Sequence, residues 1–118
     1  MKQSGFDKVI RAALARDEVV YAGFSAGAVV TYKSLKGLEL VDDPYDVPFG
    51  YDTEVVWDGL GLVPFALAVH FKSDHSESTS IDSVIAYYEA QGVPYRTLRD
   101  GEVLVVDGDR EQILGPSE

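Results

Sequence analysis

Apolar positions along the chain change between helical spacing and short continuous runs. Between residues 6 and 15 they recur at intervals of three and four, which predicts an amphipathic helix. Residues 19–24 form a short apolar run without alternation, which is typical of a strand buried on both faces of a parallel sheet. The composition of residues 26–35 again favours a helix.

The second half of the chain repeats this order of strand and helix. The predicted elements are a loop over 36–57 with a short strand near 54–57, a strand over 65–71, a loop over 72–80, a helix over 81–90, and strands over 95–98, 102–106 and 112–114. A hydroxyl side chain from 78–80 is expected to cap the helix, and Gly92 to end it. Turns at 99–101 and 107–109 are expected to be hairpins.

This alternation predicts an α/β fold with a mixed, mostly parallel sheet and flanking helices. At 118 residues the chain is long enough for one small domain, so residues 1–118 are taken as a single unit. The apolar fraction of 46% is ordinary for a chain that buries one core.

Charge and cysteine content exclude several kinds of site and partner. There are 20 acidic and 10 basic residues, a formal charge of −10, which disfavours binding to nucleic acid or to an anionic membrane. The chain has no cysteine, so neither disulfides nor thiolate metal sites are available. Its first residues lack the apolar run of a signal peptide, and we expect a soluble, cytoplasmic protein.

The most informative motif is Ser25 between Gly23 and Gly27, where the predicted buried strand meets a helix. A nucleophile elbow needs a sharp turn at the serine and small neighbours, because the chain packs closely against itself there. The N–H of Ala26, at the start of the helix, is then placed to stabilise an oxyanion. The motif therefore predicts a serine nucleophile.

A serine hydroxyl needs a base to take its proton, and the chain has only two histidines. His70 ends a predicted buried strand, and the carboxyl ends of parallel strands form the ligand crevice of open α/β sheets. His75 lies in a polar segment that is typical of a solvated loop. We therefore expect His70 to be the base.

The acid that would orient the histidine is not determined by composition, because the acidic residues are so numerous. Asp100 lies in one predicted turn, and Asp42 and Asp43 lie in the long loop. All three remain candidates at this point.

Two elements together resemble the dipeptidase E (aspartyl dipeptidase) family of serine peptidases. They are Tyr21-Ala22-Gly23-Phe24-Ser25-Ala26-Gly27-Ala28 and Gly59-Leu60-Gly61-Leu62-Val63-Pro64 followed by Val69-His70-Phe71. The resemblance runs through nearly the whole chain. It implies a class I glutamine amidotransferase-like fold, Ser25 as nucleophile, His70 as base, an acid at Asp100 or in the Asp42-Asp43 segment with Asp100 favoured, and small peptides as substrates.

The chain departs from this family in two ways. The family has an amino-terminal part ahead of the region that matches Met1, with strands and a glycine-rich loop expected to supply a second oxyanion donor. The chain therefore resembles the carboxyl-terminal portion of such a domain, and a second copy is expected to cover exposed sheet edges. The segment 77–83 also lacks the arginine on which the family's aspartyl preference depends.

Other functions fit the sequence less well. A non-catalytic binding or assembly module on the same fold is the alternative, and an esterase of the α/β-hydrolase fold ranks last because the chain is too short for that sheet. Residues 107–109 lack the ligand spacing of a calcium loop, and His70 with His75 is a weak zinc pattern. No metal or cofactor is expected.

Overall fold

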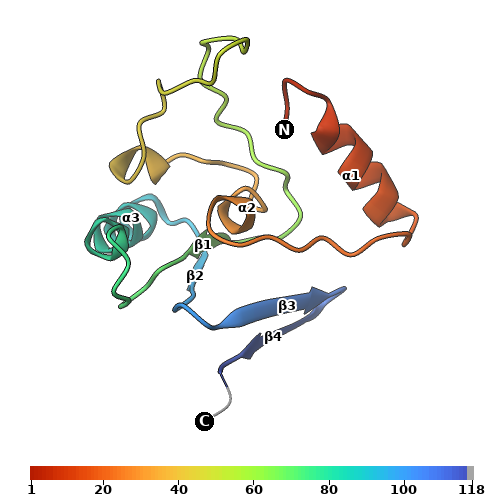
Figure 1. The fold of residues 1–118 in the computed structure, drawn as a ribbon. Coiled ribbons are helices and arrows are strands. Elements are labelled where there is room, and N and C mark those ends of the chain that lie inside the picture. The colour runs from red at the N-terminus through yellow and green to blue at the C-terminus, as the bar shows by residue number, and fades with distance from the viewer. Residues whose placement is uncertain (117–118) are drawn as a thin grey trace.

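The computed structural model describes residues 1–116 (Figure 1). Its elements are α1 (Phe6–Ala15), α2 (Ala26–Val29), the 3-10 helix η1 (Leu38–Leu40), β1 (Ala66–Ala68), α3 (Ser78–Gln91), β2 (Tyr95–Thr97), β3 (Val103–Asp107) and β4 (Arg110–Leu114). The α/β class predicted from the sequence is confirmed.

The core is built around β1, whose residues are all buried. β1 pairs in parallel with β2, with Ala66 opposite Tyr95 and Ala68 opposite Thr97. Successive side chains of a strand point to opposite faces, so the segment divides its neighbours between two layers. On one face, Phe65 and Leu67 pack with Ala28 of α2 and with Leu98. On the other, Ala66 packs with Tyr32 and with Val84 and Tyr88 of α3.

The predicted helix over residues 6–15 is confirmed as α1, although part of its apolar face is open to solvent. Phe6 is 47% exposed and Val9 is 62% exposed. Arg11 ties the helix to the rest of the chain, because its guanidinium donates to the carbonyl of Leu60 at 2.8 Å and to that of Gly59 at 3.1 Å.

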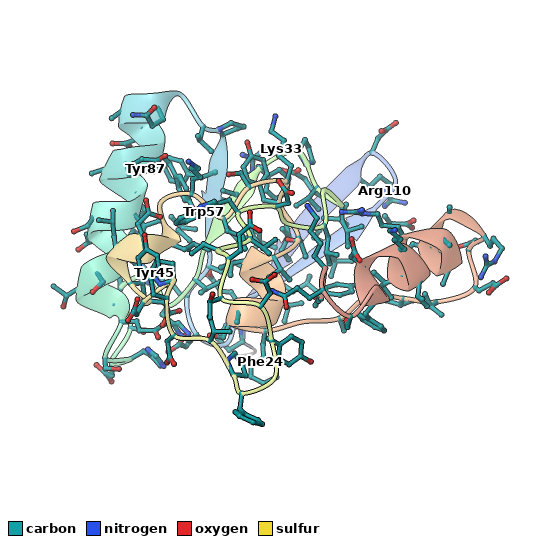
Figure 2. All side chains as sticks on the ribbon, turned by 90° about the horizontal axis from the view of Figure 1, so that it is seen from above. Phe24, Lys33, Tyr45, Trp57, Tyr87 and Arg110 are labelled. Atoms are coloured by element: carbon teal, nitrogen blue, oxygen red, sulfur yellow. The ribbon has the colours of Figure 1, made fainter. Side chains whose placement is uncertain are left out.

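The predicted buried strand over residues 19–24 does not form. Val20 and Phe24 are each 90% exposed, and the Phe24 side chain points away from the molecule (Figure 2). A strand requires a neighbour for its backbone hydrogen bonds, and no segment within residues 1–116 pairs with this one. The run is apolar as its sequence suggests, but it joins neither of the two sheets in residues 1–116.

The carboxyl-terminal strands form a separate antiparallel hairpin, with Val103 opposite Leu114 and Asp107 opposite Arg110. The turn at 107–109 is the predicted hairpin turn, and Gly108 adopts a φ of 57° in it. The turn at 99–101 is not a hairpin, because it leads from β2 in one two-stranded sheet to β3 in the other. The sheet is therefore in two parts within the described residues, one parallel and one antiparallel.

The helix after Ser25 ends at Val29, well before residue 35, because the chain crosses residues 59–63 there. The carbonyls of Val30 and Thr31 accept hydrogen bonds from Leu60 and Leu62, each at 2.7 Å. Carbonyls bonded to a crossing segment no longer support a following turn of helix.

The long loop contains η1, and the strand expected near 54–57 is absent from the described residues apart from one bridge between Ser34 and Asp58. α3 begins at Ser78 without a side-chain cap, so the cap expected from 78–80 is wrong. Its end is as predicted, with Gly92 at a φ of 68°. No helix in residues 1–116 is both long enough and apolar enough to span a bilayer.

The different burial of two valines predicts that the same substitution changes the free energy of unfolding by different amounts. Val84 is fully buried between α3 and β1, so Val84→Ala should lower the free energy of unfolding by about 2 kcal/mol through lost burial and a small cavity. Val20→Ala should change it by less than about 0.5 kcal/mol, because Val20 is already in water. Urea unfolding measures both, and equal losses would contradict the exposed placement of residues 19–24.

Candidate active site

Ser25 has the backbone of a nucleophile elbow. Its φ is 51° and its ψ is −118°, a region that residues with a Cβ rarely adopt. Hydrogen bonds to α2 stabilise the turn, since the Ser25 carbonyl accepts from the N–H groups of Ala28 at 3.0 Å and Val29 at 3.1 Å. The hydroxyl of Tyr21 also donates to the Gly27 carbonyl at 2.6 Å.

The two glycines of the motif have different roles. A Cβ on Gly23 would lie 2.6 Å from the carbonyl oxygen of Gly27, so the turn cannot close around a larger residue. A Cβ on Gly27 would meet only the Tyr21 hydroxyl, at 3.8 Å. Close packing across the turn therefore explains why position 23 is a glycine. At position 27 a larger residue would fit.

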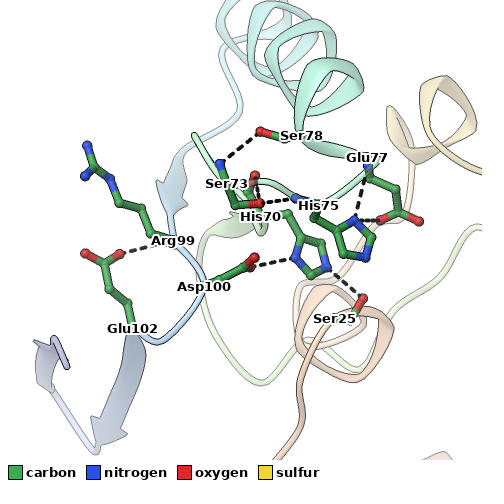
Figure 3. Close-up of polar contacts among 9 residues, drawn as sticks. All are labelled: Ser25, His70, Ser73, His75, Glu77, Ser78, Arg99, Asp100 and Glu102. Carbon is green, nitrogen blue, oxygen red and sulfur yellow. Dashed lines mark hydrogen bonds and ion pairs between the residues drawn. The ribbon is translucent and has the colours of Figure 1, made fainter.

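His70 follows β1 and faces Ser25. Its Nε2 lies 3.2 Å from the Ser25 Oγ, and its side chain is 15% exposed (Figure 3). The backbone at His70 also has a positive φ, 57°, which residues with a Cβ rarely adopt. The structure thus brings the predicted nucleophile and base within hydrogen-bond distance.

Asp100 contacts the other side of the imidazole. Its Oδ1 lies 2.7 Å from the His70 Nδ1 (Figure 3). This hydrogen bond is the main reason why the pKa of Asp100 is lowered below the ordinary aspartate value. A carboxylate that accepts from Nδ1–H leaves Nε2 unprotonated and able to accept the serine proton.

The other two candidate acids lie elsewhere. Asp43 accepts the N–H of Tyr45 at 2.9 Å in a local turn. Asp42 lines a crevice of about 870 Å³ between α1 and the long loop, and Ser25, His70 and Asp100 are not among the residues that line it. This crevice therefore does not include the hydrogen-bonded side chains of Ser25, His70 and Asp100.

Ala26 is the first residue of α2, directly after Ser25. Within residues 1–116, no backbone or side-chain acceptor takes a hydrogen bond from its N–H. The donor therefore remains available beside the serine hydroxyl, as the sequence predicts for an oxyanion contact.

His75 is an exposed loop residue, as the sequence indicates, and it also lies against the site. Its imidazole stacks on that of His70, with ring centroids 3.8 Å apart and planes 9° apart. Its Nδ1 accepts the N–H of Glu77 at 3.1 Å. The only sequence signal was a second histidine five residues after the first, which is too common to identify a contact.

Among the described residues, His70, His75 and Glu77 are close enough to hold a metal ion, but their geometry does not favour it. Imidazole lone pairs lie in the ring plane, so two stacked rings direct them side by side and not toward one point. Both nitrogens of His70 also have partners already, in Ser25 and Asp100. Binding would require a ring to rotate and these contacts to break.

Comparison with known proteins identifies the family. The model of Peptidase family S51 matches residues 1–114. The chain belongs to this family. A curated relative, peptidase E of Streptomyces coelicolor, is 32% identical over 105 residues, and the match covers 85% of this chain and 40% of the relative.

A solved structure supports the fold of this S51 member. The crystal structure of a candidate peptidase E protein from Listeria monocytogenes EGD-e matches with a TM-score of 0.79 at 22% identity. The match covers 98% of this chain and 52% of that one. The chain thus spans about half the length of the relatives that it matches.

The elbow geometry predicts that the two glycines differ on substitution. Gly23→Ala should destabilise the protein by about 1–3 kcal/mol, because the new Cβ overlaps backbone that has no room to move. Gly27→Ala should be neutral or stabilising, because it adds helix propensity without a clash. Denaturant unfolding of both variants is the measurement, and a larger loss at Gly27 would contradict this account of the turn.

The lowered pKa of Asp100 predicts a pH dependence of stability with a definite sign. Because the folded state holds the carboxylate ionised to lower pH than the unfolded chain does, its contribution is complete above the ordinary value of 3.8 and is lost as the pH falls through the folded value. The difference in unfolding free energy between wild type and Asp100→Asn should thus shrink below about pH 4. Urea titrations from neutral to acidic pH measure it, and a constant difference would contradict it.

Proposed function

We propose that this protein is a serine-type peptidase that hydrolyses small peptides through Ser25, His70 and Asp100. One observation carries the proposal: a continuous hydrogen-bonded chain of 3.2 Å and 2.7 Å joins the three side chains, and it starts at a serine with a φ of 51°. Membership of a peptidase family and the relative named peptidase E support the same reaction class.

The chemistry follows from the positions of the protons. As the Ser25 Oγ attacks the scissile carbonyl, His70 Nε2 accepts the hydroxyl proton, and Asp100 stabilises the imidazolium that forms. The imidazolium then donates that proton to the leaving amine, so the peptide bond breaks and an acyl-serine ester remains. Water attacks the ester with His70 again as base, which releases the acid product and restores the serine.

The charge that develops on the carbonyl oxygen needs donors that are aimed at it before the reaction. In our proposal the Ala26 N–H supplies one, since it follows the nucleophile directly and has no acceptor within residues 1–116. A single missing donor of this kind lowers kcat by about 10²–10³. The Ala26 N–H is therefore expected to contribute strongly to turnover.

The substrate class is proposed more broadly than peptides with an amino-terminal aspartate. The first turn of α3 carries hydroxyl side chains and no arginine, and a hydroxyl is a poor partner for a substrate carboxylate. We expect small peptides without a strict requirement for an acidic residue.

Covalent labelling tests the nucleophile without a known substrate. A fluorophosphonate probe should label the wild-type chain, and Ser25→Ala should abolish the labelling, because the probe reacts only with an activated hydroxyl. Asp100→Asn should slow it by about 10³–10⁴-fold, because the imidazole would then hold the wrong tautomer. Ser83→Ala, at an exposed position in the middle of α3, is the matched control and should label as wild type.

Equal labelling of wild type and Ser25→Ala would end the catalytic proposal. The second candidate, a binding or assembly module on the same fold, would then be preferred, since Val20 and Phe24 are 90% exposed on a segment that pairs with no strand between residues 1 and 116. Size exclusion with light scattering would separate the cases, and a clean monomer without labelling would count against assembly.

A further inference from the structure

We propose that His75 is a positioning residue for the imidazole of His70. The proposal rests on the proposed function, because it assigns His75 to the same site. His75 lies on the loop between β1 and α3, outside the Ser25–His70–Asp100 chain of hydrogen bonds, and its ring covers one face of the His70 ring (Figure 3).

The stack is nearly parallel and close. The centroid distance of 3.8 Å and the interplanar angle of 9° are those of two flat rings in van der Waals contact. An imidazole bonded at only two in-plane nitrogens can still tilt about its side-chain torsions. A second ring pressed on its face restricts that tilt and keeps water away from that side.

His70 needs such support because its in-plane contacts are open to competition. The Asp100 side chain is 52% exposed, so water reaches the carboxylate that orients Nδ1. The Nε2–Oγ distance of 3.2 Å lies at the long end of the hydrogen-bond range, where a small tilt weakens the contact further.

The His75 ring is itself held in place. The Glu77 N–H donates to its Nδ1 at 3.1 Å, which fixes the ring orientation and leaves the proton of the neutral ring on Nε2. This backbone hydrogen bond therefore orients the ring that covers His70.

One hydroxyl joins the backbones of the two histidines. The Ser73 Oγ donates to the His70 carbonyl at 3.2 Å and accepts the His75 N–H at 3.1 Å. The Ser73 N–H in turn donates to the Ser78 Oγ at 3.1 Å, at the first residue of α3. The start of α3, a helix packed on the core through Val84 and Tyr88, thus holds the loop, and the loop holds the stack.

The test separates the ring from its hydrogen bond. His75→Ala removes both, His75→Asn keeps an acceptor for the Glu77 N–H but has no ring, and His75→Phe keeps a flat ring. Asp74→Ala, at an exposed neighbouring position, is the control. We expect the Ala and Asn variants to lower the rate of fluorophosphonate labelling by about ten- to a hundredfold, since small misplacements of reacting groups have effects of this size. His75→Phe should restore the rate.

A second readout does not depend on activity. In nitrogen-15 spectra of the same proteins, the Nδ1 proton of His70 should exchange slowly in the wild type and in His75→Phe, and should broaden or vanish in His75→Ala and His75→Asn. A persistent signal in the Ala variant, or its loss in the Phe variant, would overturn the positioning role. If the wild type is not labelled but the spectra differ as expected, the peptidase proposal fails and the positioning of His70 by His75 stands.

Discussion

The parallel pairing of β1 with β2 is the interaction on which the rest of the site depends. The two strands run in the same direction, so their carboxyl ends reach the same edge. Beyond the paired residues, the Leu98 N–H donates to the Ala68 carbonyl at 2.9 Å and the Phe71 N–H to the Leu98 carbonyl at 3.0 Å. These bonds hold the two segments together past the ends of β1 and β2, where His70 and Asp100 lie.

The layers on each face of β1 keep that edge rigid. α2 packs on one face through Ala28, and α3 packs on the other through Val84 and Tyr88. α2 also begins directly after Ser25, so the contact that buries Ala28 sets the height of the hydroxyl above the edge. The unfavourable backbone at Ser25 and His70 persists because the packed elements on both sides determine where those residues must lie.

The sequence predicts the local elements well where a residue's own neighbours decide its structure. α1, β1 and the end of α3 at Gly92 follow from helical spacing, an apolar run and a residue that tolerates positive φ. Residues 19–24 carry an equally clear strand pattern, yet they pair with no segment of the described chain, because a strand is completed by another segment and not by its own side chains. His75 was missed for a related reason, since its contact with His70 depends on how one loop folds back.

The choice between Asp100 and the pair Asp42 and Asp43 illustrates what additional information was needed. Composition cannot distinguish one acidic residue from another, whereas the strand register shows which of them lies near His70. Ala68 lies opposite Thr97 at the ends of the two strands. His70 comes two residues after Ala68, and Asp100 comes three residues after Thr97, so the two residues reach adjacent positions. Asp42 and Asp43 follow η1 in the long loop, away from both strand ends. The pairing of β1 with β2 therefore favours Asp100, which follows β2 closely, over the two acids of the long loop.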